Sequence, residues 1–233
     1  MSKKVLITQS NYIPWKGYFD AINTVDELVL YDEVQFTKRD WRNRNLIKTP
    51  QGRQWLSIPV EVKGKFFQKI KETKISDATW GRKHWASIRQ NYTKAKHFKD
   101  FGEIFEDFYL NNSLLYLSEV NLQLIKIVCK ILGISTKITF SDAYPVKRTG
   151  KNERLIDICK QLGAEVYYSG PMAQNYIDIA MFKSEGIAVE FLDYEGYPEY
   201  EQLYGAFVHQ VSILDLLFNQ GAQASKFMKS FRQ

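Results

Sequence analysis

Short apolar runs and helix-spaced apolar positions alternate along the first part of the chain. The runs at 5–9 and 27–31 are typical of buried strands, and the segment 17–22 between them has the spacing of a helix. A strand, a helix and a second strand in so short a stretch predict a βαβ unit. The sequence therefore predicts a parallel sheet whose first unit covers residues 4–31.

The next segment has the chemistry of a β-hairpin. Residues 45–49 and 54–60 have the composition of strands, and the segment 50–53 between them, Pro-Gln-Gly-Arg, is typical of a turn. Polar and apolar residues also alternate over 69–75, so we expect this segment to pair beside the hairpin.

A helical region follows. From 80 to about 132 the apolar positions recur at helical spacing, with breaks near 96–97 and 111–112, so two or three helices are expected. Gly133 stands where a glycine commonly ends a helix.

The last hundred residues return to an alternation of strands and helices. Strands are predicted at 137–140, 165–168 and 188–192, and helices at 152–162, 175–184 and 211–218. This alternation at both ends predicts an α/β fold with a parallel sheet, formed by one domain over residues 1–233. Within it we expect a β-hairpin excursion over 37–75 and a helical insertion over 80–132.

Composition excludes several classes of protein. The 233 residues are 45% hydrophobic and 25% charged, which excludes a disordered or fibrous chain. No window approaches the roughly 18 apolar residues of a membrane span, and the N-terminus has no signal-peptide pattern. Two cysteines, Cys129 and Cys159, provide no disulfide framework. We therefore expect a cytoplasmic protein without a membrane span.

The charge is unevenly distributed. Residues 1–100 contain 20 Lys+Arg and 10 Asp+Glu, a balance of +10, whereas 101–233 contain 12 and 16, a balance of −4. A basic half attracts anions, whether a nucleic acid, a nucleotide, a sugar diphosphate or a membrane surface. We interpret the lysine run at 63–74 as a solvated face. The run at 38–53 interleaves arginines with tryptophans and asparagines, which suits a phosphate-bearing ligand with a planar base.

The usual catalytic signatures are missing from the chain. It contains neither GxGxxG nor GxxxxGK[ST], so no dinucleotide fingerprint or Walker loop is indicated. The three histidines, His84, His97 and His209, have no metal-ligand spacing, so no metal site is expected. Both cysteines fall on apolar helix faces, where a thiol is usually a small core residue.

Three polar clusters remain as candidate sites. The first follows the first predicted strand and contains Gln9, Asn11, Tyr12, Trp15 and Tyr18. The second follows the next predicted strand and contains Asp32, Glu33, Gln35, Trp41, Arg42, Asn43 and Arg44. Because parallel strands gather their carboxyl ends at one edge, Gln9, Asn11, Tyr12, Trp15, Asp32 and Gln35 are expected to line one pocket.

The third cluster precedes the predicted helix at 152–162. It contains Lys147, Lys151 and Arg154, which together with a helix N-terminus form an anion-binding arrangement. Ser169 ends a later predicted strand on the same sheet edge. We expect Arg44 and Lys151 to share one anion.

The motifs at 9–19 (Gln-Ser-Asn-Tyr-Ile-Pro-Trp-Lys-Gly-Tyr-Phe) and at 32–52 resemble the WbqC-like family. The resemblance continues at 55–60, 154–159, 168–171 and 212–221, and Ser10 stands where the family usually has proline. It implies a bacterial cytoplasmic protein encoded with O-antigen and capsule biosynthesis. Some members of the family are described as glycine or aminoacyl transferases to a sugar.

The layout is also similar, more distantly, to the adenylylating nucleotidyltransferases. Trp15-x-Gly17-Tyr18 stands where those enzymes have HxGH, and the loop at 147–151 stands where their basic phosphate motif lies. This similarity implies a Rossmann-like, nucleotidyltransferase-like fold. Both catalytic histidines of that motif are missing here.

Three classes of function follow. The first is a transferase or ligase that attaches an amino acid, such as glycine, or an acyl group to the amine of a dTDP- or UDP-linked amino sugar. Its donor is ATP-activated, a thioester or an aminoacyl-tRNA. Asp32 or Glu33 is expected near the amine with Gln9 beside it, and phosphates are expected on Arg42, Arg44, Lys147 and Lys151. The alternatives are a non-catalytic protein that binds sugar nucleotides or nucleic acid, and a scaffold partner of glycosyltransferases. An oligomer is compatible with each of these classes.

Overall fold

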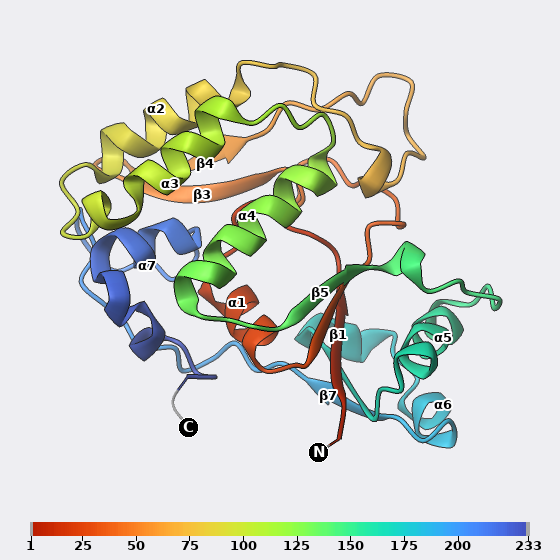
Figure 1. Cartoon of the computed structure of the whole chain (residues 1–233). Helices are drawn as coiled ribbons and strands as arrows, with labels where there is room; N and C mark the ends of the chain where they lie inside the picture. Colours follow the sequence, from red (N-terminus) through yellow and green to blue (C-terminus); the bar gives the residue numbers. More distant parts are fainter. Residues whose placement is uncertain (1, 232–233) are drawn as a thin grey trace.

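The computed structural model describes residues 2–231 and contains a five-stranded sheet in which every neighbouring pair of strands is parallel. The strand order is β5-β2-β1-β6-β7 (Figure 1). The strands are β1 (Lys4–Thr8), β2 (Glu27–Leu30), β5 (Lys137–Phe140), β6 (Val166–Ser169) and β7 (Ala188–Phe191). Helix α1 (Lys16–Asn23) connects β1 to β2, so the predicted parallel α/β sheet and its first βαβ unit are confirmed.

Both faces of the sheet are covered by helices. Successive residues of a strand point to opposite sides, so they enter different cores. Val5 and Ile7 of β1 pack into one apolar core with α5 (Lys151–Leu162) and α6 (Ile179–Ser184). Leu6 packs into the other core, which contains α1, α4 (Leu117–Leu132) and α7 (Ile213–Gln220). Because side chains on both faces are buried, the sequences of the strands are continuous apolar runs.

A hairpin and two further helices extend this second core. Strands β3 (Arg44–Thr49) and β4 (Gly52–Ser57) form a separate antiparallel pair. Helices α2 (Trp80–Tyr92) and α3 (Phe98–Asn111) pack on each other and lie over the hairpin (Figure 1). The predicted hairpin and helical region are both observed, and the region contains three helices. Gly133 ends α4 in the left-handed conformation, with φ of 72°.

Two predicted elements differ from the structure, one in kind and one in extent. The segment 69–75 is no strand: it contains the short 3₁₀ turn Ile70–Glu72 and makes only isolated bridges to 35, 60 and 116. The helix expected over 175–184 begins only at Ile179, because the Asp178 carboxylate caps it by accepting a hydrogen bond from Met181 N. The residues before it form the 3₁₀ helix Pro171–Asn175 instead.

The strand order determines where a ligand crevice can form. From β1 the chain proceeds to β2 and β5 on one side, and then crosses to β6 and β7 on the other. In open parallel sheets, ligands bind at the carboxyl edge where the direction of winding reverses. Here that point lies beside β1. The loops after β1 and β7 reach it, and the second of these runs over residues 192–212.

Candidate functional site

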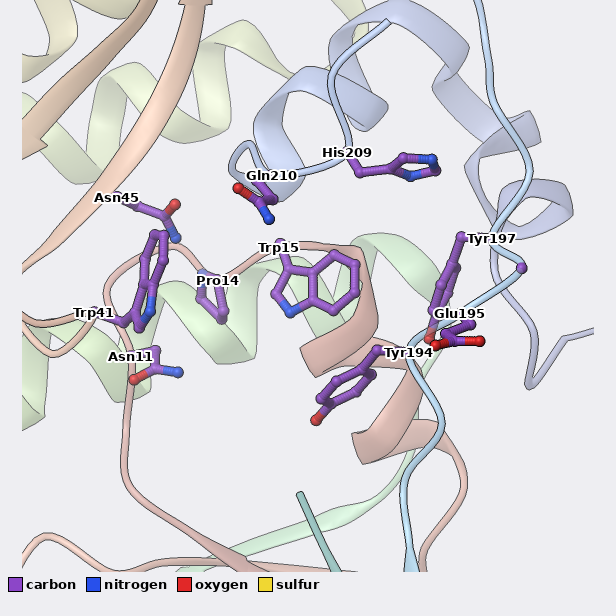
Figure 2. Close-up of a pocket in the computed structure, with 11 residues that line it drawn as sticks. Asn11, Pro14, Trp15, Trp41, Asn45, Tyr194, Glu195, Tyr197, His209 and Gln210 are labelled. Carbon is purple, nitrogen blue, oxygen red and sulfur yellow. The ribbon is translucent and has the colours of Figure 1, made fainter. Parts of the chain in front are cut away.

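A pocket opens at the carboxyl edge of the sheet, where the loop after β1 meets the loop after β7 (Figure 2). Its volume is about 560 Å³, within the range of small-molecule sites. Its walls come from four segments that are distant in the sequence. The lining residues are Asn11, Pro14, Trp15, Trp41, Asn45, Tyr194, Glu195, Gly196, Tyr197, His209 and Gln210.

Aromatic rings form much of the wall. Trp15 meets Tyr194 and Tyr197 edge to face, with ring centroids 5.2 and 5.4 Å apart. Across the pocket, Trp41 is 41% exposed and leans on Trp55, with centroids 5.3 Å apart. Figure 2 shows Trp15 between the Trp41 side and the two tyrosines. Such rings provide flat apolar faces on which a base or a sugar ring can stack.

The loop after β1 is held in place by buried hydrogen bonds. Ser10 N donates to Asp32 Oδ1 at 2.8 Å, which joins the loops after β1 and β2. Asn45 Nδ2 donates to the carbonyl oxygens of Tyr12 and Ile13 at 3.0 and 2.7 Å. Ile13 has a φ of 36°, a left-handed conformation that a β-branched residue adopts only when its surroundings impose it. The Asn45 amide therefore fixes the turn that presents Trp15.

Two arginines, Arg42 and Arg44, contact residues at the edge of the pocket without lining it. Arg42 donates from Nη1 to Asn11 Oδ1, and Asn11 itself lines the pocket. The Arg44 guanidinium lies 4.0 Å from the Trp55 ring centroid and donates to the Arg39 carbonyl. Two guanidinium groups beside exposed indoles suit a ligand that joins a planar base to phosphates.

His209 is the imidazole of the pocket. Partial burial, together with the positive charge of Lys16, lowers the pKa of His209 from its ordinary value. Lys16 itself is buried, donates to the Pro198 carbonyl at 2.8 Å and lies over the rings of Tyr197 and Tyr200. His209 is therefore mostly neutral at neutral pH and can accept a proton.

A buried carboxylate holds the far wall against the body of the protein. Asp215 of α7 accepts hydrogen bonds from Tyr92 and Tyr200, both at 2.9 Å. Burial raises the pKa of Asp215. Nearby, Lys48 donates to Gln202 and to the Ala206 carbonyl at 2.9 and 2.6 Å. These contacts fix the segment 200–206 and, with it, the loop that supplies the second wall.

The structure brings only some of the sequence-predicted residues to this pocket. Asn11, Trp15 and Trp41 line it. Tyr12 lies in the core, where its hydroxyl contacts His84 Nδ1 at 2.7 Å and the Tyr109 hydroxyl at 2.9 Å. Tyr12 thus supports the loop from below.

Three further candidates shape the same loop without lining the pocket. The Tyr18 hydroxyl donates to the Gln9 carbonyl at 3.0 Å. Burial, followed by the charge of Asp32, raises the pKa of Tyr18. Asp32 is buried, and its second oxygen, Oδ2, has no hydrogen-bond partner.

The remaining residues of the second cluster are engaged elsewhere. Glu33 pairs with Lys69 and Lys71 at 3.7 and 3.2 Å. Gln35 Nε2 donates to the Phe66 carbonyl at 2.8 Å. Asn43 Nδ2 donates to the carbonyl oxygen of residue 58 at 2.9 Å, which ties the start of the hairpin together. None of these three lines the pocket.

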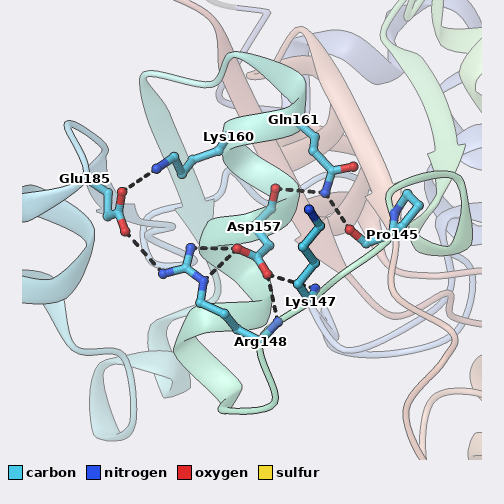
Figure 3. A network of polar contacts seen from close by, with 7 residues as sticks. All are labelled: Pro145, Lys147, Arg148, Asp157, Lys160, Gln161 and Glu185. Carbon is cyan, nitrogen blue, oxygen red and sulfur yellow. Dashed lines mark hydrogen bonds and ion pairs between the residues drawn. The ribbon is translucent and has the colours of Figure 1, made fainter.

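The basic loop before α5 belongs to a network on the other face of the sheet (Figure 3). Arg148 binds Asp157 at 2.6 Å and Glu185 at 3.2 Å, and its bonds lower the pKa of Asp157. Lys147 N donates to Asp157 Oδ2 at 3.2 Å, while Lys151 is exposed at the start of α5. This network fixes the loop on the helix. The pocket lining contains none of Lys147, Lys151, Arg154 or Ser169.

Sequence reasoning missed the wall that the loop after β7 provides. Tyr194, Glu195, Tyr197, His209 and Gln210 were not among the candidates. A signal was present, because the segment 192–212 follows the last strand, is rich in tyrosine and has no periodicity. Long loops without secondary structure in a compact fold are commonly functional.

Neither a metal cluster nor a membrane-spanning helix is present in residues 2–231. In that part of the chain no group of three or more His, Cys, Asp or Glu side chains is arranged to hold a metal ion. No helix among the described residues is both long and apolar enough to cross a membrane.

Comparison with known proteins agrees with the motifs of the sequence. The model of the WbqC-like protein family matches residues 9–227. The chain is 49% identical over 231 residues to the uncharacterized protein Rv1507c of Mycobacterium tuberculosis, and this covers 99% of the chain and 100% of that protein. No solved structure matched the chain. The chain belongs to the WbqC-like protein family.

Proposed function

We propose that this protein is a transferase or ligase of surface-polysaccharide biosynthesis. It attaches an amino acid, such as glycine, or another acyl group to the amine of a nucleotide-linked amino sugar, with a dTDP- or UDP-sugar as acceptor. The observation that carries the proposal is the pocket itself. Aromatic faces, amides, one carboxylate and one imidazole converge there at the reversal point of a parallel sheet, beside two arginines.

The composition of the pocket supports a sugar-nucleotide acceptor. Trp41 and Trp15 provide stacking faces for the base and the sugar ring. The amides of Asn11 and Gln210 recognise hydroxyl and carbonyl groups, which fixes the orientation of the ligand. A pyrophosphate would bind toward Arg42 and Arg44, whose planar donor groups suit phosphate oxygens.

The chemistry requires an activated acyl donor, either an acyl-adenylate made from ATP or an aminoacyl thioester or ester. The sugar amine attacks the acyl carbon, so a C–N bond forms and the bond to the leaving phosphate oxygen, thiol sulfur or ester oxygen breaks. The proton released from nitrogen passes to the neutral imidazole of His209. The carboxylate of Glu195 anchors the incoming amine. Asp32, buried behind the loop, holds the loop that carries Trp15.

We also propose that the fold is Rossmann-like and of the nucleotidyltransferase type. The parallel order β5-β2-β1-β6-β7, with its reversal beside β1, supports this assignment. Trp15 and Tyr18 occupy the positions at which those enzymes carry histidines, so this chain would activate its donor without an imidazole at that motif.

The assay combines ATP, glycine and a UDP- or dTDP-amino sugar and follows the amide product by mass spectrometry. AMP release that depends on both substrates supports the ligase, while product formed only from an aminoacyl donor supports the transferase. His209→Gln and Glu195→Gln are expected to lower kcat by roughly a hundredfold. His97→Gln is the matched control, because His97 pairs with Asp100 at 2.7 Å outside the pocket.

The prediction that Arg44 and Lys151 bind one phosphate group is tested separately. Each alanine variant is expected to weaken sugar-nucleotide binding by roughly 1–3 kcal/mol, the range for a charge-assisted hydrogen bond. Losses that are coupled in the double variant support a shared phosphate group. Additive losses, or no loss of affinity with Lys151→Ala, contradict a shared phosphate group. The phosphate contacts would then be made by Arg42 and Arg44 alone.

The same assay separates catalysis from binding alone. A wild-type protein that binds the sugar nucleotide but forms no amide with any of the three donors would be a non-catalytic sugar-nucleotide protein. Binding of RNA or DNA that weakens steeply with salt would favour a nucleic-acid protein.

A further inference from the structure

Two phenylalanine side chains are exposed to solvent on a surface loop. Phe66 and Phe67 are 70% and 82% exposed, and Phe67 has the highest value among the large hydrophobic side chains that remain exposed on the described chain. Their rings touch edge to face, with centroids 5.0 Å apart. They belong to residues 61–69, here named the Phe loop, which lies at the upper right of Figure 1 just before the 3₁₀ turn Ile70–Glu72.

Hydrogen bonds to its backbone carbonyls hold the Phe loop in place. Gln35 Nε2 donates to the Phe66 carbonyl at 2.8 Å, and Phe36 N donates to the Gln68 carbonyl at 2.9 Å. Gln68 Nε2 then donates to the Glu61 carbonyl at 2.6 Å, which closes the base of the loop. The exposure of the two rings is therefore built into the fold.

Lysines flank the phenylalanines in the sequence. The Phe loop contains Lys63, Lys65 and Lys69 against the single acid Glu61, a balance of +2. Lys65 pairs with Glu61 and Lys69 with Glu33, while no ion pair is seen for Lys63 within residues 2–231. The segment that sequence analysis interpreted as a solvated lysine face thus combines cations with an apolar tip.

We propose that the Phe loop docks this protein on an anionic lipid surface. The two rings insert at the boundary between headgroups and acyl chains, and the lysines reach lipid phosphates. A lipid surface fits better than a protein partner, because two rings are far too small for the roughly 800 Å² per partner that a stable interface buries. The contact is peripheral and reversible.

The test is flotation of the full chain with vesicles of phosphatidylglycerol and phosphatidylcholine, in parallel with vesicles of phosphatidylcholine alone. The wild type is expected to float with the anionic vesicles and to be released by high salt. The Phe66→Ala/Phe67→Ala variant is expected to bind at least about tenfold more weakly. Its matched control is Met172→Ala/Ile179→Ala, which removes two other exposed hydrophobic side chains, 75% and 52% exposed.

Charge is tested in the same way. Lys63→Glu/Lys65→Glu is expected to abolish the preference for anionic vesicles. Lys94→Glu/Lys96→Glu is the control, since these exposed lysines lie at the turn between α2 and α3, at the opposite end of Figure 1. All variants should keep the wild-type melting temperature, because only exposed side chains change.

Insertion is read directly with a polarity-sensitive dye on Phe67→Cys. Labelling is selective, because Cys129 and Cys159 are both buried. The dye emission is expected to shift to the blue when anionic vesicles are added. Absence of flotation by the wild type, or flotation with an unshifted dye, overturns the proposal. Self-association that is lost in the Phe double variant, without flotation, shows a protein interface and overturns it equally.

Discussion

At the scale of single residues, His84 links the core to the loop after β1. It is buried between the Tyr12 hydroxyl and the Ser57 carbonyl, which lie 2.7 Å from Nδ1 and 3.2 Å from Nε2. Nε2–H donates to the carbonyl, so Nδ1 carries no proton and accepts from Tyr12. Burial disfavours the charged imidazolium and lowers the pKa of His84 from 6.5 to about 4.

This pKa shift predicts a loss of stability in acid. Because the folded-state pKa of His84 lies below its unfolded value, its contribution is complete above about pH 6.5 and is lost as pH falls toward 4. The free energy of unfolding is expected to fall by roughly 3 kcal/mol over this window. The variant His84→Gln keeps a donor for the Ser57 carbonyl. Denaturant titrations of this variant should show a smaller dependence of the unfolding free energy on pH in this window. An unchanged slope would mean that other groups produce the acid sensitivity.

Gly17 sets the position of the pocket's central ring. A Cβ at this position would lie 2.3 Å from Cζ2 of Trp15, so Gly17→Ala must displace the indole. Alanine is otherwise favourable in a helix, and the melting temperature should change little. Sugar-nucleotide affinity, measured by calorimetry, should fall about tenfold as the ring leaves its contacts with Tyr194 and Tyr197. Unchanged affinity would show that Trp15 does not contact the ligand.

At the scale of elements, α2 and α3 approach so closely that only glycine fits between them. A Cβ on Gly81 would lie 2.2 Å from the Tyr109 carbonyl oxygen, and backbone cannot rotate away. Gly81→Ala should therefore destabilise the protein by roughly 1–3 kcal/mol in denaturant titrations. In the control Gly102→Ala the nearest atom is a Phe98 ring carbon at 3.2 Å, so little change is expected. Equal effects of the two variants would contradict the close packing of the helices.

The same scale separates what the sequence predicts from what it cannot predict. Buried parallel strands read as apolar runs, so β1, α1 and β2 could be located within a residue or two. Tyr12 was expected to line the pocket because it lies in a polar segment, but it is buried in the core. The sequence could not show this, because its partners His84 and Tyr109 lie 72 and 97 residues away. The far wall of the pocket could not be predicted for a similar reason. Its loop has no hydrophobic periodicity, and its position depends on the hydrogen bond from Tyr200 to Asp215, a residue of another element.

At the scale of the whole molecule, the basic half contains two different surfaces. The arginines at 42 and 44 lie beside the pocket, whereas the lysines of the Phe loop stand apart from it around two exposed rings. In the proposed arrangement, one surface binds an anionic ligand and the other an anionic lipid surface. Composition alone gave a single excess of positive charge, and only the fold divides it.

The central claim is that the pocket beside β1 binds a nucleotide-linked amino sugar. Calorimetric titration of UDP- and dTDP-amino sugars into the wild type, Trp15→Ala and the control Tyr176→Ala tests it most directly. Tyr176 is 54% exposed and lies outside the pocket lining. We predict saturable binding by the wild type and by Tyr176→Ala, with affinity at least about tenfold lower in Trp15→Ala. No binding by the wild type, or equal binding by all three proteins, would contradict the account.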